Sequence, residues 1–243
     1  MEPLGFSVDC HECGFSGNKA LRDATKQETC ATQTTRKIKY LEAREEIFRQ
    51  GDAASGIYSL IYGTVMISMV DARGGAFVPR LVTPGNAFGY RSSLENSKHT
   101  STAIALTDCC FCQISQERSL ELVNQNQDVR GALVNSCTQD ILSAREEIIL
   151  YSSMNLPERL LHFMITKLLH IFGSVEDDGS AKIQLPLKRG ELAMSLGVQA
   201  ETLSRAIKKL KNQELAFFEN KTVLIPSLRQ VEDHIQEELP VAL

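Results

Sequence analysis

The sequence predicts an α+β protein with an antiparallel β-roll, a long helix and a C-terminal unit of short helices and a hairpin. Three observations support this order. Short apolar runs divided by glycine fill residues 38–115, apolar residues at alternating spacings of three and four follow, and two short helix patterns flank Gly197. The 243 residues are enough for two domains, each with its own core.

The composition is that of an ordinary water-soluble chain, with 43% hydrophobic and 23% charged residues. No apolar run reaches the roughly 20 residues that cross a bilayer, and the N-terminus lacks the pattern of a secretion signal. We therefore expect a cytoplasmic protein with no membrane partner. In a reducing compartment the seven cysteines are not expected to form a disulfide framework, so some of them need another explanation.

Four regions follow one another along the chain. Residues 1–35 are polar and poor in large aliphatic side chains, so we expect no packed core there. Residues 36–125 are expected to form the β-roll as a sensor domain, residues 126–154 the long helix, and residues 155–243 the C-terminal domain. The turns between the strands of the roll are predicted at Gly51, Gly63, Gly74-Gly75 and Pro84-Gly85.

The long helix carries a narrow apolar stripe with the spacing of a coiled-coil seam. Its members are Val134, Cys137, Ile141, Ala144, Ile148 and Tyr151. A stripe this thin favours a homodimer interface, and the alternative is a helix that lies on its own β-domain. The intervening charged residues Asp140, Arg145, Glu146 and Glu147 are expected to face water. Pro157 then begins a second helix, because proline is tolerated in a first turn.

The stretch from Leu187 to Gln213 has the pattern of a helix-turn-helix. Gly197 permits the sharp turn between the two helices, and the small Ala193 lies where they must cross closely. The inward-facing residues are expected to be Leu192, Ala193, Leu196, Val198, Leu203, Ile207 and Leu210. Two short strands with a polar turn at Asn220-Lys221 follow as a wing. This combination predicts a domain that binds double-stranded DNA.

The apolar positions of the second helix leave a polar face for DNA, and its charge is basic although the whole chain has a net charge of −4. Arg205 can pair with guanine and Glu201 with a cytosine amine, whereas Lys208 and Lys209 suit phosphates. The alternative for Glu201 is an ion pair with Arg205 four residues later. The candidate DNA-contact residues are Gln199, Glu201, Thr202, Ser204, Arg205, Lys208 and Lys209, with Arg189 on the first helix.

This order of elements resembles the family of the catabolite activator (CRP) and the fumarate-and-nitrate-reduction regulator (FNR). The resemblance covers about residues 38–228 and is carried by EIFRQGD, YGTVMI, PGNAFGY, LPERLLHF and AETLSRAIKKL. It implies a cyclic-nucleotide-binding-like roll, a homodimer, and contact with RNA polymerase. Glu201, Ser204 and Arg205 are similar to the FNR branch, which implies a TTGAT-like half-site repeated as an inverted palindrome.

Cyclic-nucleotide members of this family hold the ribose and phosphate with a Gly-Glu pair and a later Arg-Ser or Arg-Thr pair. The corresponding positions here are Gly89-Tyr90 and Thr100-Ser101, and the second pair has no arginine. A phosphate without a guanidinium loses its charge-assisted, bidentate partner. We therefore do not expect a cyclic nucleotide in the roll.

The cysteines suggest a different sensor. Members of the FNR branch hold a [4Fe–4S] cluster with three N-terminal cysteines and a fourth on a late roll strand, and soft thiolates suit such clusters. The resemblance implies Cys10, Cys13 and Cys112 as ligands, with Cys30 as the third N-terminal one. Sixteen residues separate Cys30 from Cys13, which departs from the family's short spacing, although the entropic cost of closing a loop grows only slowly with its length.

The resemblance also implies that ligation ties the N-terminal segment to the roll and that dioxygen or nitric oxide releases it. An acidic residue of the FNR branch opposes dimerisation at the position that Ala144 occupies here, so we expect the dimer to persist without a cluster. The alternatives are the same DNA-binding role with a haem, zinc or thiol–disulfide sensor, a roll that binds without DNA, and a cysteine- or zinc-dependent enzyme. No metalloprotease, P-loop or dinucleotide motif is present, and we do not expect an enzyme.

Overall fold

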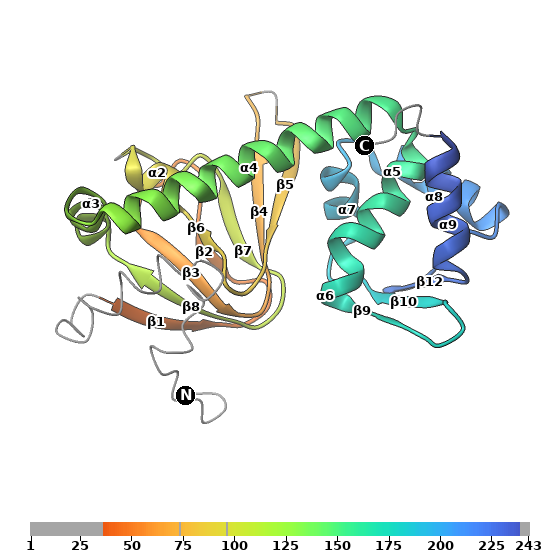
Figure 1. Cartoon of the computed structure of the whole chain (residues 1–243), viewed down its shortest axis with the longest axis horizontal. Coiled ribbons are helices and arrows are strands. Elements are labelled where there is room, and N and C mark those ends of the chain that lie inside the picture. Colours follow the sequence, from red (N-terminus) through yellow and green to blue (C-terminus); the bar gives the residue numbers. More distant parts are fainter. Residues whose placement is uncertain (1–35, 73, 96, 239–243) are drawn as a thin grey trace. The chain divides into compact units, whose positions relative to one another are not determined.

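A computed structural model of the chain describes residues 36–72, 74–95 and 97–238 (Figure 1). The chain divides after Asp140 into two compact units, the first mainly β and the second mainly helical. The expected α+β fold, with a roll, a long helix and a winged helix-turn-helix, is confirmed. Cys10, Cys13 and Cys30 lie outside the described residues. Within those residues, no helix is both long and apolar enough to span a membrane.

The first unit is an antiparallel roll of two four-stranded sheets (Figure 1). One sheet has the strand order β1-β8-β3-β6 and the other the order β2-β7-β4-β5. The strands are β1 (Arg36–Leu41), β2 (Glu46–Phe48), β3 (Ile57–Tyr62), β4 (Val65–Val70), β5 (Ala76–Val82), β6 (Ala87–Phe88), β7 (Thr102–Ala105) and β8 (Cys109–Ile114).

Aromatic rings fill the interior of the roll. Phe48, Tyr58, Phe88 and Phe111 lie with ring centroids 5.1 to 6.2 Å apart, in stacked, tilted and edge-on pairs that suit aromatic quadrupoles. The ring of His99 stacks on Phe48 at 3.8 Å and is buried. These residues belong to a core whose members come from both sheets, which explains why short strands suffice to hold the roll together.

The helices in the described part of this unit are α2 (Tyr90–Leu94), α3 (Gln116–Gln125) and the beginning of α4 (Gln127–Ser153). The hydroxyl of Ser115 accepts a hydrogen bond from the amide of Arg118 and caps α3. Val129 and Leu133 of α4 are buried in one apolar cluster with residues of the roll. The interpretation of α4 as a helix that packs on its own β-domain is therefore correct for its first turns.

In the second unit, a capping box starts the helix that follows α4. The side chain of Asn155 accepts from the amide of Glu158, whose carboxylate accepts from the amide of Asn155, so both groups cap α5 (Leu156–Phe163). The helix continues as the π-helix η2 (Met164–Leu169) and as α6 (His170–Phe172). The remaining elements are β9 (Gly173–Val175), β10 (Ala181–Gln184), α7 (Arg189–Ser195), α8 (Ala200–Asn212), β11 (Phe217–Glu219), β12 (Thr222–Ile225) and α9 (Leu228–Glu238).

Two acidic residues of α4 differ from expectation, because neither simply faces water. Asp140 is half-buried and accepts hydrogen bonds from Arg80 and Tyr90. Glu147 forms an ion pair with Lys167 of η2 at 2.8 Å. The sequence pattern could not reveal either contact, since the partners lie 60 and 20 residues away along the chain.

Candidate nucleic-acid interface

The helix-turn-helix of the second unit is built as expected. Gly197 joins α7 to α8 with a φ of 65°, in the left-handed region that favours glycine. The amides of Gly197 and Val198 donate to the carbonyls of Met194 and Ala193 and close the turn. The residues predicted to face inward are buried, except for a half-buried Val198, and Ala206 joins them.

Every candidate DNA-contact residue on α8 is exposed. Four residues, Leu203, Ala206, Ile207 and Leu210, fix the buried side of the helix. The opposite side presents Gln199, Glu201, Thr202, Ser204, Arg205, Lys208 and Lys209. Arg205 donates to Glu201 at 2.6 Å between Nη2 and Oε1, so the ion pair considered from the sequence is present.

Arg189 joins the same polar face from the neighbouring helix. Its guanidinium donates to the hydroxyl of Ser204 at 3.4 Å, and that hydroxyl donates to the carbonyl of Ala200 at 2.8 Å. Arg189 is exposed at the first position of α7. Its positive charge therefore lies beside the exposed polar side of α8, which is the side expected to contact DNA.

The wing has the form expected of a two-stranded hairpin. β11 and β12 pair antiparallel, and the turn between them contains Asn220 with a φ of 53°. Asparagine tolerates this left-handed conformation better than most residues. The carbonyl of Lys221 accepts from the amide of Leu185 at 2.6 Å, which ties the turn to the segment after β10. The side chain of Lys221 is exposed at the tip of the wing.

The predicted seam of α4 separates into two faces. Val134, Ile141 and Ile148, seven residues apart, are 65%, 68% and 70% exposed. Cys137 instead packs against the apolar cluster of the roll, and Tyr151 is half-buried with the guanidinium of Arg159 over its ring. Ala144 is exposed, and so are Leu142 and Ile149 next to the first face.

The three cysteines of β8 are buried. Cys109 points into the interior of the roll, where its thiol donates to the carbonyls of Thr64 and Thr107, and burial raises its pKa. Cys112 lies on the other side of the strand, in the cluster that includes Tyr90 and Leu133. Among the residues from 36 onward that the structure describes, no group of three or more His, Cys, Asp or Glu is arranged to hold a metal ion.

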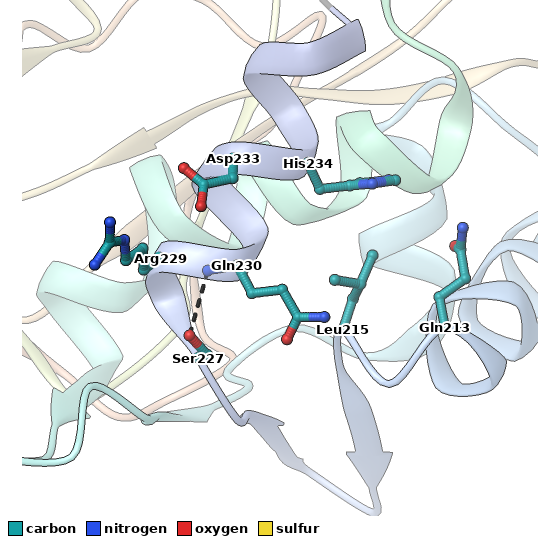
Figure 2. A pocket seen from close by; sticks show the side chains of 7 residues that line it. All are labelled: Gln213, Leu215, Ser227, Arg229, Gln230, Asp233 and His234. Carbon is teal, nitrogen blue, oxygen red and sulfur yellow. Dashed lines mark hydrogen bonds between the residues drawn. The ribbon is translucent and has the colours of Figure 1, made fainter.

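The second unit also has an open pocket of about 570 Å³ at the end of α8 and along α9. Figure 2 shows its lining, with Arg229, Asp233 and His234 on α9 and Gln213 and Leu215 after α8. The amide of Gln230 donates to the hydroxyl of Ser227 at 3.2 Å within it. None of the lining residues is a candidate DNA-contact residue, so this pocket is not part of the candidate interface.

Two family models match the chain, and they fall on the two units. A cyclic nucleotide-binding domain matches residues 38–126, and a Crp-like helix-turn-helix domain matches residues 158–233. A transcriptional regulator of the CRP/FNR family from Thermus thermophilus has a TM-score of 0.68 at 21% identity, covering 82% of this chain and 98% of that one. The chain therefore has the fold of a transcription regulator of this class.

Curated relatives point to the same class. The transcriptional activator protein FnrA of Stutzerimonas stutzeri is 26% identical over 217 residues, which is 89% of this chain and 88% of the relative. An anaerobic regulatory protein of Pasteurella multocida is 23% identical over 222 residues, covering 91% of this chain and 80% of the relative. The two family models thus match both units, and these relatives are similar to the chain over most of its length.

Proposed function

We propose that this protein is a cytoplasmic, dimeric transcription regulator that binds a TTGAT-like inverted repeat and acts on RNA polymerase. The exposed Glu201–Arg205 pair on α8 is the observation that supports sequence-specific binding most strongly. A solvent-exposed acidic residue on a helix that approaches DNA repels phosphates. Glu201 is therefore favoured there only if it accepts from a base or orients Arg205, and both roles discriminate between sequences.

The dimer is supported by the exposed apolar face of α4. Val134, Ile141 and Ile148 lie at heptad spacing, as the a positions of a two-stranded coiled coil do. The nearest exposed apolar neighbours, Leu142 and Ile149, widen this face. A second copy of α4 covers the same residues in a two-fold arrangement, which is the most common symmetry among homo-oligomers.

The arrangement makes a geometric prediction about the DNA site. Two α8 helices of a dimer reach major grooves about one helical turn, ~34 Å, apart. Fluorescence anisotropy with duplexes whose half-sites are separated stepwise tests this. We expect tight binding at one spacing and a loss of at least about tenfold when about five base pairs are inserted, which turns one half-site to the opposite side of the duplex. Equal affinity at every spacing contradicts a dimer of this geometry.

For the sensor, we propose a [4Fe–4S] cluster held by Cys112 together with Cys10, Cys13 and Cys30. Cys112 suits this role because it lies in an apolar cluster beside α4, on the side of β8 away from the roll interior. When bound, such a cluster supplies a centre that dioxygen or nitric oxide attacks. The chain would contribute the sulfur of Cys112, which is buried in the same apolar cluster as Val129 and Leu133 of α4, so a change in its ligation would occur next to this helix.

The chain is also long enough to bring the N-terminal cysteines to this place. Ile38 of β1 pairs directly with Cys112 of β8. Cys30 precedes Ile38 by eight residues, which can span up to about 26 Å when extended. The number of residues between Cys30 and Ile38 is therefore compatible with Cys30 as a ligand together with Cys112.

Iron and sulfide analysis with a visible spectrum, before and after exposure to air, tests the sensor. We expect a broad brown absorbance that air bleaches and that Cys112→Ser abolishes. Cys109→Ser is the matched control, because this thiol on the same strand points into the roll interior, and it should keep the colour. A sharp Soret band would indicate a haem sensor instead. A protein without visible absorbance would indicate a zinc or thiol–disulfide sensor. Colour that survives in Cys112→Ser rejects the ligand assignment.

A further inference from the structure

The carboxylate of Asp140 lies between two polar side chains of the roll. Arg80 of β5 donates from Nη1 to Oδ2 of Asp140 at 3.0 Å, and the hydroxyl of Tyr90 on α2 donates to the same oxygen. Three elements thus meet at one atom, although Asp140 is 60 residues from Arg80 and 50 from Tyr90. We call these three residues the roll–helix latch.

Arg80 and Tyr90 both donate hydrogen bonds to Asp140, so the loss of Asp140 removes a polar partner from each of them. Tyr90 is 2% exposed, and burial together with the neighbouring Asp140 raises its pKa far above the ordinary tyrosine value. Its hydroxyl therefore stays protonated and remains a donor at every physiological pH. The side chains of Arg80 and Asp140 are about one-third exposed. Hydrogen bonds between charged partners are stronger than neutral ones, and loss of one partner leaves the other poorly satisfied.

Asp140 lies on the side of α4 that packs against the roll. Leu133 and Cys137, two turns and one turn before Asp140, pack against the same apolar cluster of the roll. An α-helix turns by 3.6 residues, so Leu133, Cys137 and Asp140 share one side. Val134 and Ile141 each follow a member of this side by one residue and lie about 100° around the helix.

We propose that the roll–helix latch fixes the rotation of α4 on the roll and so determines that Val134 and Ile141 face a second copy of the chain. The apolar contacts of Leu133 alone would allow α4 to rotate about its own axis, because such contacts are not directional. The shared carboxylate oxygen accepts from fixed directions and holds the helix at one angle. This proposal rests on the proposed dimer, and its local part, the anchoring of α4, can be measured without it.

The alkylation rate of Cys137 in the native, full-length protein reports the anchoring directly. Peptide mass spectrometry resolves this thiol from the other six cysteines, and iodoacetamide is the probe. We expect Asp140→Ala and Arg80→Asp each to raise the rate on the order of tenfold. The double change Arg80→Asp with Asp140→Arg restores an ion pair of reversed polarity and should return the rate toward that of the wild type.

Two further variants keep the measurement specific. Tyr90→Phe retains the buried ring and removes only the hydroxyl, so it should give a smaller increase in a chain that folds. Glu121→Ala breaks an ion pair of similar length with Arg118 on α3 and should leave the Cys137 rate unchanged. Sedimentation equilibrium on the same proteins should show a dimer dissociation constant raised about tenfold in the two single latch variants and recovered in the reversed pair.

The outcomes separate the latch from the dimer. Unchanged alkylation in Asp140→Ala and Arg80→Asp rejects the latch. Faster alkylation with an unchanged dimer rejects the claim that the latch determines the dimer face. A wild-type chain that stays monomeric rejects the proposed dimer together with that claim, while the alkylation series still decides whether the latch anchors α4.

Discussion

Arg205 donates to the carboxylate of Glu201 one helical turn earlier on α8, and both side chains are at least three-quarters exposed. In water such a pair contributes only about 0.3–0.5 kcal/mol to folding. The pair therefore has little structural value in the free protein. We expect it instead to hold the flexible guanidinium of Arg205 in one orientation before DNA binds, which would reduce the conformational entropy lost on binding.

Glu201→Ala should separate stability from recognition. We expect the thermal midpoint to stay within a few degrees of the wild-type value, because the pair is exposed. Discrimination between a TTGAT-like inverted repeat and a half-site mismatch should fall by roughly 1–3 kcal/mol, the usual contribution of a good base contact. Calorimetry and anisotropy titrations measure the two quantities. A large drop in the midpoint with unchanged discrimination would assign Glu201 to the fold instead.

Lys208→Ala should weaken binding without changing the preferred sequence. Lysines late on a recognition helix suit phosphates, which carry no sequence information. We expect similar losses on specific and scrambled duplexes, and a slope of log affinity against log salt that is smaller by about one. Glu219→Ala, at an exposed site on β11, removes a charge of opposite sign and should not reduce the slope. A loss confined to one base position argues that Lys208 reads a base.

Ile148→Glu should dissociate the dimer. This side chain is 70% exposed at the end of the apolar face of α4, and a pair of symmetry-related glutamates placed there repel each other. We expect a dissociation constant higher by at least about tenfold in sedimentation experiments. Val175→Glu on β9, which is 56% exposed, is the matched control and should leave the dimer intact.

The wild-type chain should remain dimeric at micromolar concentration after removal of any iron and sulfide, because the uncharged Ala144 occupies its position in the predicted seam. Sedimentation of the protein before and after that treatment measures this directly. A mainly monomeric apo form contradicts the expectation.

Acidification should destabilise both units. Burial lowers the pKa of His99 in the roll and of His162 in α5, and Lys167 lowers that of His162 further. The unfolded chain then binds more protons than the folded one at pH values below the ordinary histidine pKa of about 6.5. Stability is therefore complete above that pKa and falls as the pH drops through it. Urea unfolding at about pH 7.5 and about pH 5.5 measures the difference, which should shrink in His99→Gln.

Local patterns predicted the second unit well. Gly197, the apolar spacing of α8 and the turn at Asn220 each act over a few residues, so the sequence contains their physical cause. The polar face of α8 followed from the same spacing, and its candidate residues are all exposed. Arg189 was expected at the interface, but its hydrogen bond to Ser204 comes from the crossing of two helices, which spacing does not specify.

The sequence was less informative about α4. Its 3-4 spacing correctly indicated a helix, but the first half of this helix packs on the roll. Of the predicted stripe, Cys137 contacts the roll, whereas Val134, Ile141 and Ile148 are exposed to solvent. Asp140 was assigned to water because charged residues between apolar ones usually face it. Its partners Arg80 and Tyr90 are distant in sequence, and only the closed roll brings them beside the helix.

The most direct measurement compares the affinity of wild-type protein and of Arg205→Ala for a TTGAT-like inverted repeat and for a scrambled duplex of equal length. The comparison is made at physiological salt, both under air and without oxygen. We expect the wild type to prefer the repeat in at least one oxygen regime, and Arg205→Ala to lose most of that preference while keeping its weaker affinity for scrambled DNA. A wild type without preference in either regime, or a variant that retains the full preference, contradicts the proposal that α8 reads DNA through Arg205.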